Sequence, residues 1–371
     1  MTPDRRAVPK IRVLVVDDAV VIRRILSDVL EDDPDIEVAG TAANGRIALA
    51  KLTQVNPDIV ILDVEMPEVD GLTTLRTMRA NGHKQPVIMF STLTEKAATT
   101  TLDALAAGAS DYVTKPANVG SVVEAKQRVR EQLIPKIKAL STGILLPQPP
   151  PRRVAPATVS AAAPRPRPAG ARIDCIAIGV STGGPNALTA LFRQLPGDLA
   201  APIVMVQHMP PVFTRQLADR LSAVSPITVT EGEPGVPLRP GHAVLAPGDH
   251  HMEVVRHGIE VRVRLHQGPP ENSCRPAADV LFRSVAATYG ANTLAVVLTG
   301  MGFDGLRGVQ HIRERGGSVI VQDRATSVVW GMPGAVAEAG LADKVLPLDL
   351  ISTELVRRVG AGRSAGLIAR S

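Results

Sequence analysis

Three side chains that together could hydrolyse an ester each follow a short apolar run of the sequence. Ser181 lies in the pattern GVSTG (residues 179–183), and His208 and Asp304 follow two later runs. A serine hydroxyl becomes an effective nucleophile when a histidine removes its proton and an acid orients that histidine. If the apolar runs are parallel strands, their carboxyl ends meet at one edge of a sheet. The pattern therefore predicts a serine hydrolase with His208 as base and Asp304 as orienting acid.

The glycine-rich segment around Ser181 has two other interpretations. Ser181 could cap a helix that begins near Pro185, or the segment could be a dinucleotide-binding loop. The loop is disfavoured because Ser181 occupies the position of the middle glycine in G-x-G-x-x-G. A serine at a strand-to-helix turn instead presents its hydroxyl beside a positive helix end, where an oxyanion is stabilised. The order serine, histidine, aspartate disfavours the α/β-hydrolase fold, whose order differs.

Other potential nucleophiles and bases have less support. Cys274 is disfavoured as a thiol nucleophile because nothing near it in the sequence supplies a base. Neither Cys274 nor Cys175 has the spacing of a zinc site, and two cysteines cannot form a disulfide framework. The other histidines are interpreted as structural or solvated: His83, His242, His250, His251, His257, His266 and His311.

A second candidate site combines acidic side chains with a hydroxyl and a lysine. Asp17 and Asp18 follow one apolar run, Asp63 follows another, and Ser91 and Lys115 follow two more. Clustered carboxylates suit a hard cation such as Mg²⁺, and Asp63 could attack phosphorus while Mg²⁺ and Lys115 neutralise the phosphoryl oxygens. Ser91 would then hydrogen-bond the phosphate. The structural alternative makes Asp18 a helix cap and Asp63 a solvated loop residue.

The elements that position these groups alternate between β-branched runs and helical patterns. Before residue 133 the expected strands are 11–16, 36–39, 59–62, 87–90 and 111–113. Apolar residues at helical spacing predict a helix over 22–30. Five pairs of strand and helix predict an α/β domain with an open five-stranded parallel sheet, of the doubly wound, flavodoxin-like type.

A second α/β domain is expected after the first. Its expected strands are 175–178, 203–206 and 294–298, with a strand-rich middle at 227–229, 242–245, 252–255 and 259–265. Glycines and prolines in this middle predict hairpins inserted into or beside a doubly wound sheet. The expected segments are a first domain over 10–133, a linker over 134–172 and a second domain over 173–365.

The composition fits a globular protein whose excess charge lies in the linker. Of 371 residues, 45% are hydrophobic, 21% charged and 2% aromatic, and the net charge is +5. Residues 132–172 contain seven basic and no acidic side chains, and eight prolines lie within 147–168, so we expect a semi-extended tether. The scarcity of aromatic residues disfavours single-strand nucleic-acid binding. No apolar run has the length of a membrane span, so we expect a cytoplasmic protein that is not membrane-embedded.

Residues 11–133 resemble the receiver domain of two-component response regulators. The resemblance implies Mg²⁺-dependent phosphorylation of Asp63 by a histidine kinase. The metal ligands that it implies are Asp17, Asp18, Asp63 and the backbone carbonyl of Glu65. The switch residues that it implies are Ser91, Tyr112 and Lys115.

The second domain resembles the catalytic domain of CheB, the chemotaxis response regulator protein-glutamate methylesterase family, through residues 179–185, 207–210 and 299–305. The resemblance implies the triad Ser181, His208 and Asp304, with the backbone amide of Met301 as oxyanion donor. It implies a phosphorylation-activated hydrolase that demethylates glutamate methyl esters of methyl-accepting chemotaxis receptors and deamidates receptor glutamines, with no cofactor for ester hydrolysis. The implied partners are these receptors and a chemotaxis histidine kinase.

Two other functions compete with this interpretation. The protein could be a response regulator whose second domain only binds a dinucleotide or a protein partner, with no catalysis. A DNA-binding regulator is indicated by the positive net charge alone, and the second domain shows no helix-turn-helix pattern with clustered basic residues. We therefore expect no nucleic-acid partner.

Overall fold

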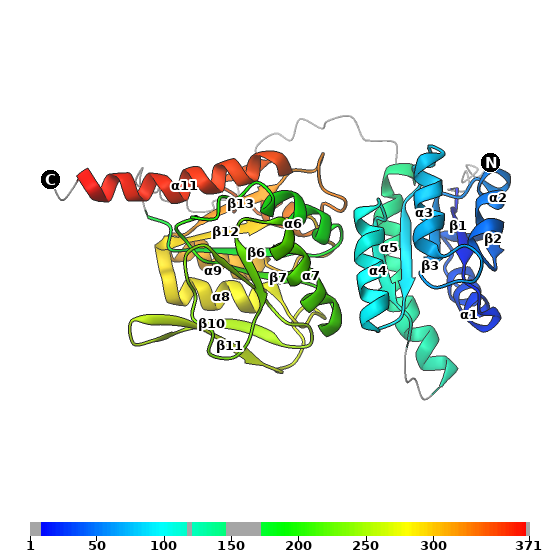
Figure 1. Ribbon diagram of the computed structural model, residues 1–371, viewed down its shortest axis with the longest axis horizontal. Coiled ribbons are helices and arrows are strands. Elements are labelled where there is room, and N and C mark those ends of the chain that lie inside the picture. Colours follow the sequence, from blue (N-terminus) through cyan, green and yellow to red (C-terminus); the bar gives the residue numbers. More distant parts are fainter. Residues whose placement is uncertain (1–8, 117–120, 146–171, 369–371) are drawn as a thin grey trace, which may run out of the picture. The chain divides into compact units, whose positions relative to one another are not determined.

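The chain forms two compact units in the computed structural model, which describes residues 9–116, 121–145 and 172–368. The units span Met1–Thr158 and Val159–Ser371, and each has a sheet of its own (Figure 1). Most of the predicted linker, residues 146–171, lies outside the described residues.

The first unit contains a five-stranded parallel sheet in the order β2-β1-β3-β4-β5. Its strands are β1 (Ile11–Val16), β2 (Ile36–Ala42), β3 (Ile59–Asp63), β4 (Val87–Ser91) and β5 (Asp111–Thr114). The central strands are continuous runs of buried apolar residues, as expected where helices cover both faces of a sheet. The predicted flavodoxin-like sheet is confirmed.

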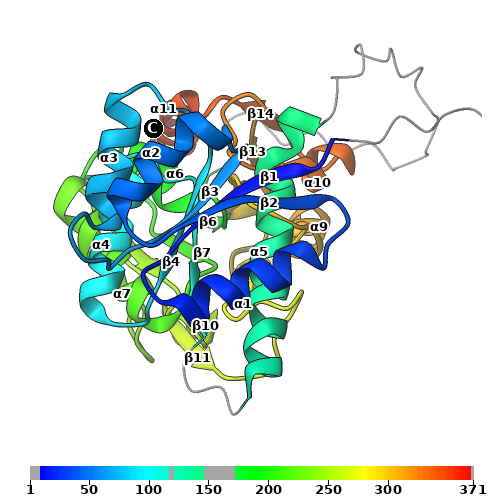
Figure 2. The same ribbon diagram turned by 90° about the vertical axis from the view of Figure 1, so that its right-hand side faces the viewer.

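Helices cover both faces of this sheet (Figure 2). They are α1 (Val20–Glu31), α2 (Gly45–Val55), α3 (Gly71–Ala80), α4 (Glu95–Ala106) and α5 (Val122–Leu145). Helices α1 and α5 lie together on one face, while α2, α3 and α4 follow one another across the other. The residue that caps α1 is Ala19, so the interpretation of Asp18 as the helix cap is wrong.

Helix α5 continues past residue 133, where the first domain was expected to end. Leu133 and Ile137 are fully buried in the core formed with β1 and α1. Lys136 Nζ lies 2.6 Å from Asp111 Oδ2, so part of the basic segment is paired with acids of this unit. The predicted boundary falls inside a packed helix because the spacing of Leu133 and Ile137 continues the buried face of α5.

The second unit contains a seven-stranded parallel sheet in the order β14-β13-β12-β6-β7-β9-β8. Its strands are β6 (Cys175–Val180), β7 (Ile203–Gln207), β8 (Thr228–Glu231), β9 (His242–Leu245), β12 (Thr293–Val297), β13 (Ser318–Gln322) and β14 (Lys344–Leu346). A separate antiparallel hairpin joins β10 (His251–His257) to β11 (Glu260–His266). The hairpin confirms the predicted insertion, whereas β8 and β9 extend the parallel sheet and β13 and β14 were not expected.

The helices of this unit also lie on both faces of its sheet. They are α6 (Gly184–Phe192), α7 (Pro211–Val224), α8 (Ala278–Tyr289), α9 (Leu306–Glu314), α10 (Met332–Glu338) and α11 (Leu348–Ile368). Helices α8 and α9 pack together, with the β10–β11 hairpin against α8 (Figure 1), while α6 contacts α7 and α11. Among the helices described, none is both long enough and apolar enough to cross a membrane.

The order of the strands reverses at β6. From β6 the chain continues to β7 on one side and later returns to β12 on the other. In open parallel sheets the loops at the carboxyl ends diverge at such a point and leave room for a ligand. The loops after β6, β7 and β12 contain Ser181, His208 and Asp304.

Candidate functional site

The loop between β6 and α6 contains Ser181. Val180 ends the strand, and Gly183 is the N-cap of α6 with a φ of 77°, a conformation that favours glycine. Because Gly183 is the N-cap, the interpretation of Ser181 as the helix cap is wrong. Gly179 lets α8 approach β6 closely, since a Cβ at this position would lie 3.0 Å from the Cβ of Ala278.

Contacts from both neighbouring strand ends hold the backbone of Ser181. Its amide donates to the carbonyl of Thr299 (3.0 Å), and its carbonyl accepts from Gln207 Nε2 (3.0 Å). Within the described chain, the hydroxyl of Ser181 makes no hydrogen bond. The loop is thus fixed while its hydroxyl is available to a substrate. The roles of Thr299 and Gln207 were not predicted.

The register between β6 and β7 places His208 next to Ser181. Val180 pairs with Gln207, and Ser181 and His208 are the residues that follow them. His208 Nε2 lies 2.8 Å from Asp304 Oδ2, and both side chains are largely buried, 14% and 3% exposed. The structure therefore brings His208 and Asp304 into contact beside the Ser181 loop.

Burial and hydrogen bonding act in opposite directions on the pair His208 and Asp304. Burial disfavours the imidazolium, but hydrogen bonds with Asp304 and Cys274 outweigh it and raise the pKa of His208 to about 10. Burial also disfavours the Asp304 carboxylate, but hydrogen bonds from His208 and the Ala278 amide outweigh it and hold the pKa of Asp304 below its usual value. The pair therefore favours the imidazolium beside the carboxylate, and the free base, which can accept a proton from a hydroxyl, becomes more populated as the pH rises.

Cys274 lies at the other nitrogen of the His208 ring. Its Sγ is 3.6 Å from His208 Nδ1. The expectation that no base lies near this thiol is wrong, because the segment 267–277 after β11 returns the chain to the end of β7. His208, Cys274 and Asp304 have possible metal-ligand atoms within 4.8 Å of one another. The thiol contacts Nδ1 and the carboxylate contacts Nε2, on different sides of the ring. A single metal ion bound to one of these nitrogens could therefore not take the place of both contacts.

The loop between β12 and α9 lies against Ser181. A Cβ at Gly300 would be only 2.9 Å from the Cβ of Ser181. The next residue is Met301, whose amide has no backbone acceptor within the described chain. A free amide close to a nucleophile is what an oxyanion hole requires. This placement supports the role predicted for Met301.

In the first unit, the carboxyl ends of β1, β3 and β5 bring a second set of charged groups together. Lys115 Nζ lies 2.8 Å from Asp17 Oδ2 and 2.8 Å from Asp63 Oδ2. The carboxylates of Asp17, Asp18 and Asp63 have oxygens within 4.8 Å of one another. Burial raises the pKa of Asp63 to about 6 against the lowering effect of Lys115, and the Asp17 charge adds to the rise. Three converging carboxylates fit Mg²⁺, which prefers oxygen ligands and favours ionised acids.

The other residues predicted for this site lie around it. Ser91 ends β4 and is fully buried, with its Oγ 2.8 Å from Thr101 Oγ1 on α4. Tyr112 on β5 is also buried, and this burial raises the pKa of its phenol. Glu65 follows β3, and its exposed carboxylate lies 3.8 Å from Lys96 Nζ. Ser91 is therefore bound to α4 in this structure and not to the carboxylates.

Comparison with known proteins assigns both units. A family model described as CheB methylesterase matches residues 176–355, and a response regulator receiver domain model matches residues 13–127. The chain is similar to a protein-glutamate methylesterase/protein-glutamine glutaminase of Nocardioides sp., with 58% identity over 96% of this chain and 97% of that protein. The chain belongs to the CheB family.

Further relatives of this CheB-family chain match one or both units. A protein-glutamate methylesterase/protein-glutamine glutaminase of Trichodesmium erythraeum is 51% identical over 95% of this chain and 100% of its own length. The crystal structure of the Thermotoga maritima CheB methylesterase catalytic domain is 43% identical and covers 50% of this chain and 98% of that chain, with a TM-score of 0.49.

The imidazole of His208 in this CheB-family chain should titrate at alkaline pH. Asp304→Asn removes the charge that stabilises the imidazolium, so we expect the midpoint to fall toward the ordinary histidine value of about 6.5. NMR of the full-length protein labelled with ¹³C-histidine measures both midpoints, and His208→Gln assigns the resonance. A midpoint near the ordinary value in the unsubstituted protein would contradict the ion pair.

Proposed function

We propose that this CheB-family protein demethylates glutamate methyl esters of methyl-accepting chemotaxis receptors and deamidates receptor glutamines. Its relatives carry both activities in their names and match it over nearly its whole length. The observation that carries the proposal is the contact of His208 with Asp304, at 2.8 Å, beside the loop where Ser181 leaves β6. A carbonyl carbon at this edge would meet a nucleophile, a base and the free amide of Met301.

In the first step, Ser181 Oγ bonds to the side-chain carbonyl carbon of the substrate. His208 takes the hydroxyl proton through Nδ1, because Nε2 faces Asp304. The amide of Met301 and the N-terminus of α6 stabilise the oxyanion. His208 then donates the proton to the leaving group, so methanol leaves from an ester and ammonia from an amide. The glutamyl group is left as an ester on Ser181.

In the second step, water releases the glutamyl group. The oxygen of the water molecule attacks the acyl carbon while His208 Nδ1 takes a proton from this water. The bond to Ser181 breaks, and His208 returns the proton to the serine oxygen. Asp304 stays ionised, since its pKa is held low, and stabilises the imidazolium in both steps.

Cys274 lies at the nitrogen that this mechanism uses as the base, and it therefore offers a second candidate nucleophile. Its Sγ is 3.6 Å from His208 Nδ1, and a thiol activated by histidine is a strong nucleophile. Catalysis by Ser181 requires its hydroxyl to reach the same nitrogen. Ser181 is favoured because it lies against the loop with the free Met301 amide.

The first unit acts in this proposal as the switch that activates the hydrolase. Asp63 attacks the phosphorus of a phosphodonor, and an aspartyl phosphate forms as the donor's leaving group departs. Asp17, Asp18 and Asp63, with the backbone carbonyl of Glu65, would hold Mg²⁺, which when bound offsets the charge of the phosphoryl oxygens. Lys115, which is 2.8 Å from Asp63, would hold one of these oxygens.

Ser91 and Tyr112 would transmit the phosphorylated state. A phosphoryl group on Asp63 offers acceptor oxygens to the hydroxyl of Ser91, in competition with its contact to the carbonyl of Ala97 on α4 (3.5 Å). Loss of that contact would loosen α4, beside the strand that contains Tyr112. The partners in this proposal are the receptors and a chemotaxis histidine kinase, with no nucleic acid, in the cytoplasm.

Ser181→Ala should abolish methanol release from methyl-esterified receptor in membranes. Loss of a triad nucleophile costs about 10³- to 10⁶-fold in rate. Cys274→Ala is the matched control, and we expect it to stay within about tenfold of the unsubstituted protein, since it leaves the nucleophile in place. If instead Cys274→Ala lost methanol release and Ser181→Ala kept it, the thiol would be the nucleophile.

Asp63→Asn should block phosphorylation by acetyl phosphate in the presence of Mg²⁺, because an amide oxygen is a poor nucleophile. The matched control is Asp58→Asn, at the opposite end of β3, where the side chain still accepts from the amide of Arg12. Incorporated phosphate and methanol release are measured together. Phosphate that persists in Asp63→Asn would place the phosphorylation elsewhere, and unchanged methanol release on phosphorylation of the unsubstituted protein would contradict activation.

A further inference from the structure

Two buried carboxylates lie next to each other behind His208. Asp304 is 3% exposed, and Asp279, in the first turn of α8, is fully buried. Burial raises the pKa of Asp279, the amide of Gly308 opposes this rise, and the Asp304 charge adds to it. Two such carboxylates disfavour each other's ionisation unless hydrogen-bond donors compensate.

The two carboxylates accept hydrogen bonds from each other's helices: Asp304, before α9, accepts from the start of α8, and Asp279, on α8, accepts from the first turn of α9. Asp304, just before α9, accepts from the amides of Ala278 (2.6 Å) and Asp279 (3.1 Å) at the start of α8. Asp279, on α8, accepts from the amide of Gly308 (2.6 Å) in the first turn of α9. Helix N-termini stabilise carboxylates, so this exchange joins the two helix starts and fixes both acids.

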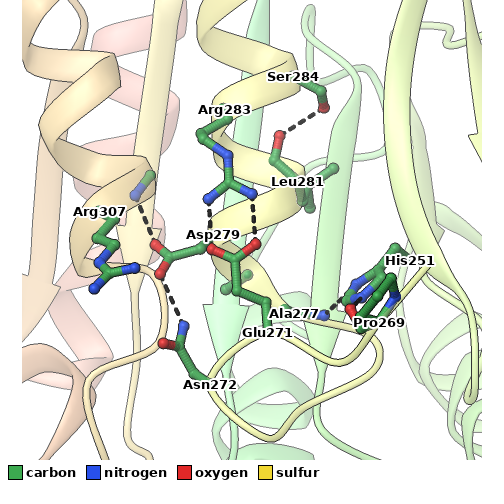
Figure 3. A network of polar contacts seen from close by, with 12 residues as sticks. His251, Pro269, Glu271, Asn272, Ala277, Asp279, Leu281, Arg283, Ser284 and Arg307 are labelled. Atoms are coloured by element: carbon green, nitrogen blue, oxygen red, sulfur yellow. Dashed lines mark hydrogen bonds and ion pairs between the residues drawn. The ribbon is translucent and has the colours of Figure 1, made fainter.

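Asn272 connects the two acids directly. Its Nδ2 lies 2.8 Å from Asp304 Oδ1 and 2.9 Å from Asp279 Oδ2. Figure 3 shows the bond to Asp279, with the backbone amide at the start of α9 on the other side of the same carboxylate. The amide nitrogen of asparagine carries two hydrogens and no charge. It can therefore bridge two carboxylates without adding a cation that would compete with His208 for Asp304.

The segment that carries Asn272 is anchored to α8. Glu271 forms two hydrogen bonds with Arg283, of 2.6 and 2.5 Å, and its backbone pairs with that of Cys274 (Figure 3 shows the bonds to Arg283). Asn272 has a φ of 52°, in the left-handed region, which asparagine tolerates better than most residues. A residue at this position must therefore adopt a left-handed backbone conformation and also donate two hydrogen bonds.

We propose that Asn272 is a positioning residue of the esterase, which holds the carboxylate of Asp304 against His208 Nε2 by bridging it to Asp279. This inference rests on the proposed function. Asn272 acts only through Asp304, which is 2.8 Å from the ring nitrogen that faces away from the base position. The charged groups that face the two acids are His208 from the end of β7, Glu271 from the segment after β11 and Arg283 on α8.

The test compares Asn272→Gly and Asn272→Asp with the unsubstituted full-length protein. Glycine removes the amide and relaxes the left-handed backbone, while aspartate keeps the size but replaces a donor with an acceptor. We expect kcat for methanol release from methyl-esterified receptor to fall about 10- to 100-fold in each, as for groups that orient a metal ligand from behind. KM should change little. In Asn272→Gly the rising limb of the kcat profile, which follows the deprotonation of His208, should move to lower pH, because a loosened Asp304 stabilises the imidazolium less.

Ser273→Gly is the matched control. Ser273 is exposed, shares the left-handed backbone with a φ of 62°, and should keep both kcat and the pH profile. Full activity in Asn272→Asp, or an unchanged pH profile in Asn272→Gly, would overturn the positioning role. Circular dichroism shows whether a variant has unfolded. The positioning role would also be overturned if the loss of activity only followed unfolding and the pH profile of the remaining activity were unchanged. Ser181→Ala, assayed in parallel, tests the proposed function separately, since its outcome does not depend on Asn272.

Discussion

A carboxylate buried in a protein must receive hydrogen-bond donors, or it becomes protonated and loses its charge. The carboxylate of Asp304 receives five: His208 Nε2, Asn272 Nδ2 and the amides of Ala278, Asp279 and Gly305. These donors come from the end of β7, the segment after β11, the start of α8 and the loop before α9. One charge thus fixes four segments that lie between residues 208 and 305, and it leaves Nδ1 of His208 facing away from Asp304.

Both units place chemistry at the carboxyl edge of a parallel sheet, but they use charge differently. In the first unit, Asp17 and Asp63 share Lys115, and burial leaves Asp63 with a raised pKa of about 6. A cation or a phosphoryl group therefore changes the balance of charge there, as a switch requires. In the second unit the charge of Asp304 is held by five hydrogen-bond donors of the chain itself, an arrangement that suits a preorganised site.

Functional residues that directly follow strands could be predicted from the sequence, because the carboxyl ends of parallel strands lie at one edge of the sheet for any conformation of the loops. Ser181, His208 and Asp63 were predicted in this way. Asn272 and Cys274 could not be, because they reach His208 and Asp304 only when the β10–β11 hairpin returns the chain to the sheet edge. Their signal in sequence is weak, since a left-handed asparagine and a single cysteine occur in many loops. The extension of α5 was missed because the proline-rich composition that follows it masked its apolar spacing.

In the proposed mechanism Ser181, and not the thiol beside His208 Nδ1, forms the covalent intermediate. The most direct measurement is to identify the acylated side chain. The full-length protein is mixed with a 4-nitrophenyl ester, whose good leaving group lets the acyl-enzyme accumulate, and the reaction is quenched in acid, digested and analysed by mass spectrometry. We expect the acyl group on the peptide that contains Ser181, and its absence in Ser181→Ala. An acyl group on Cys274 in the unsubstituted protein would contradict the mechanism.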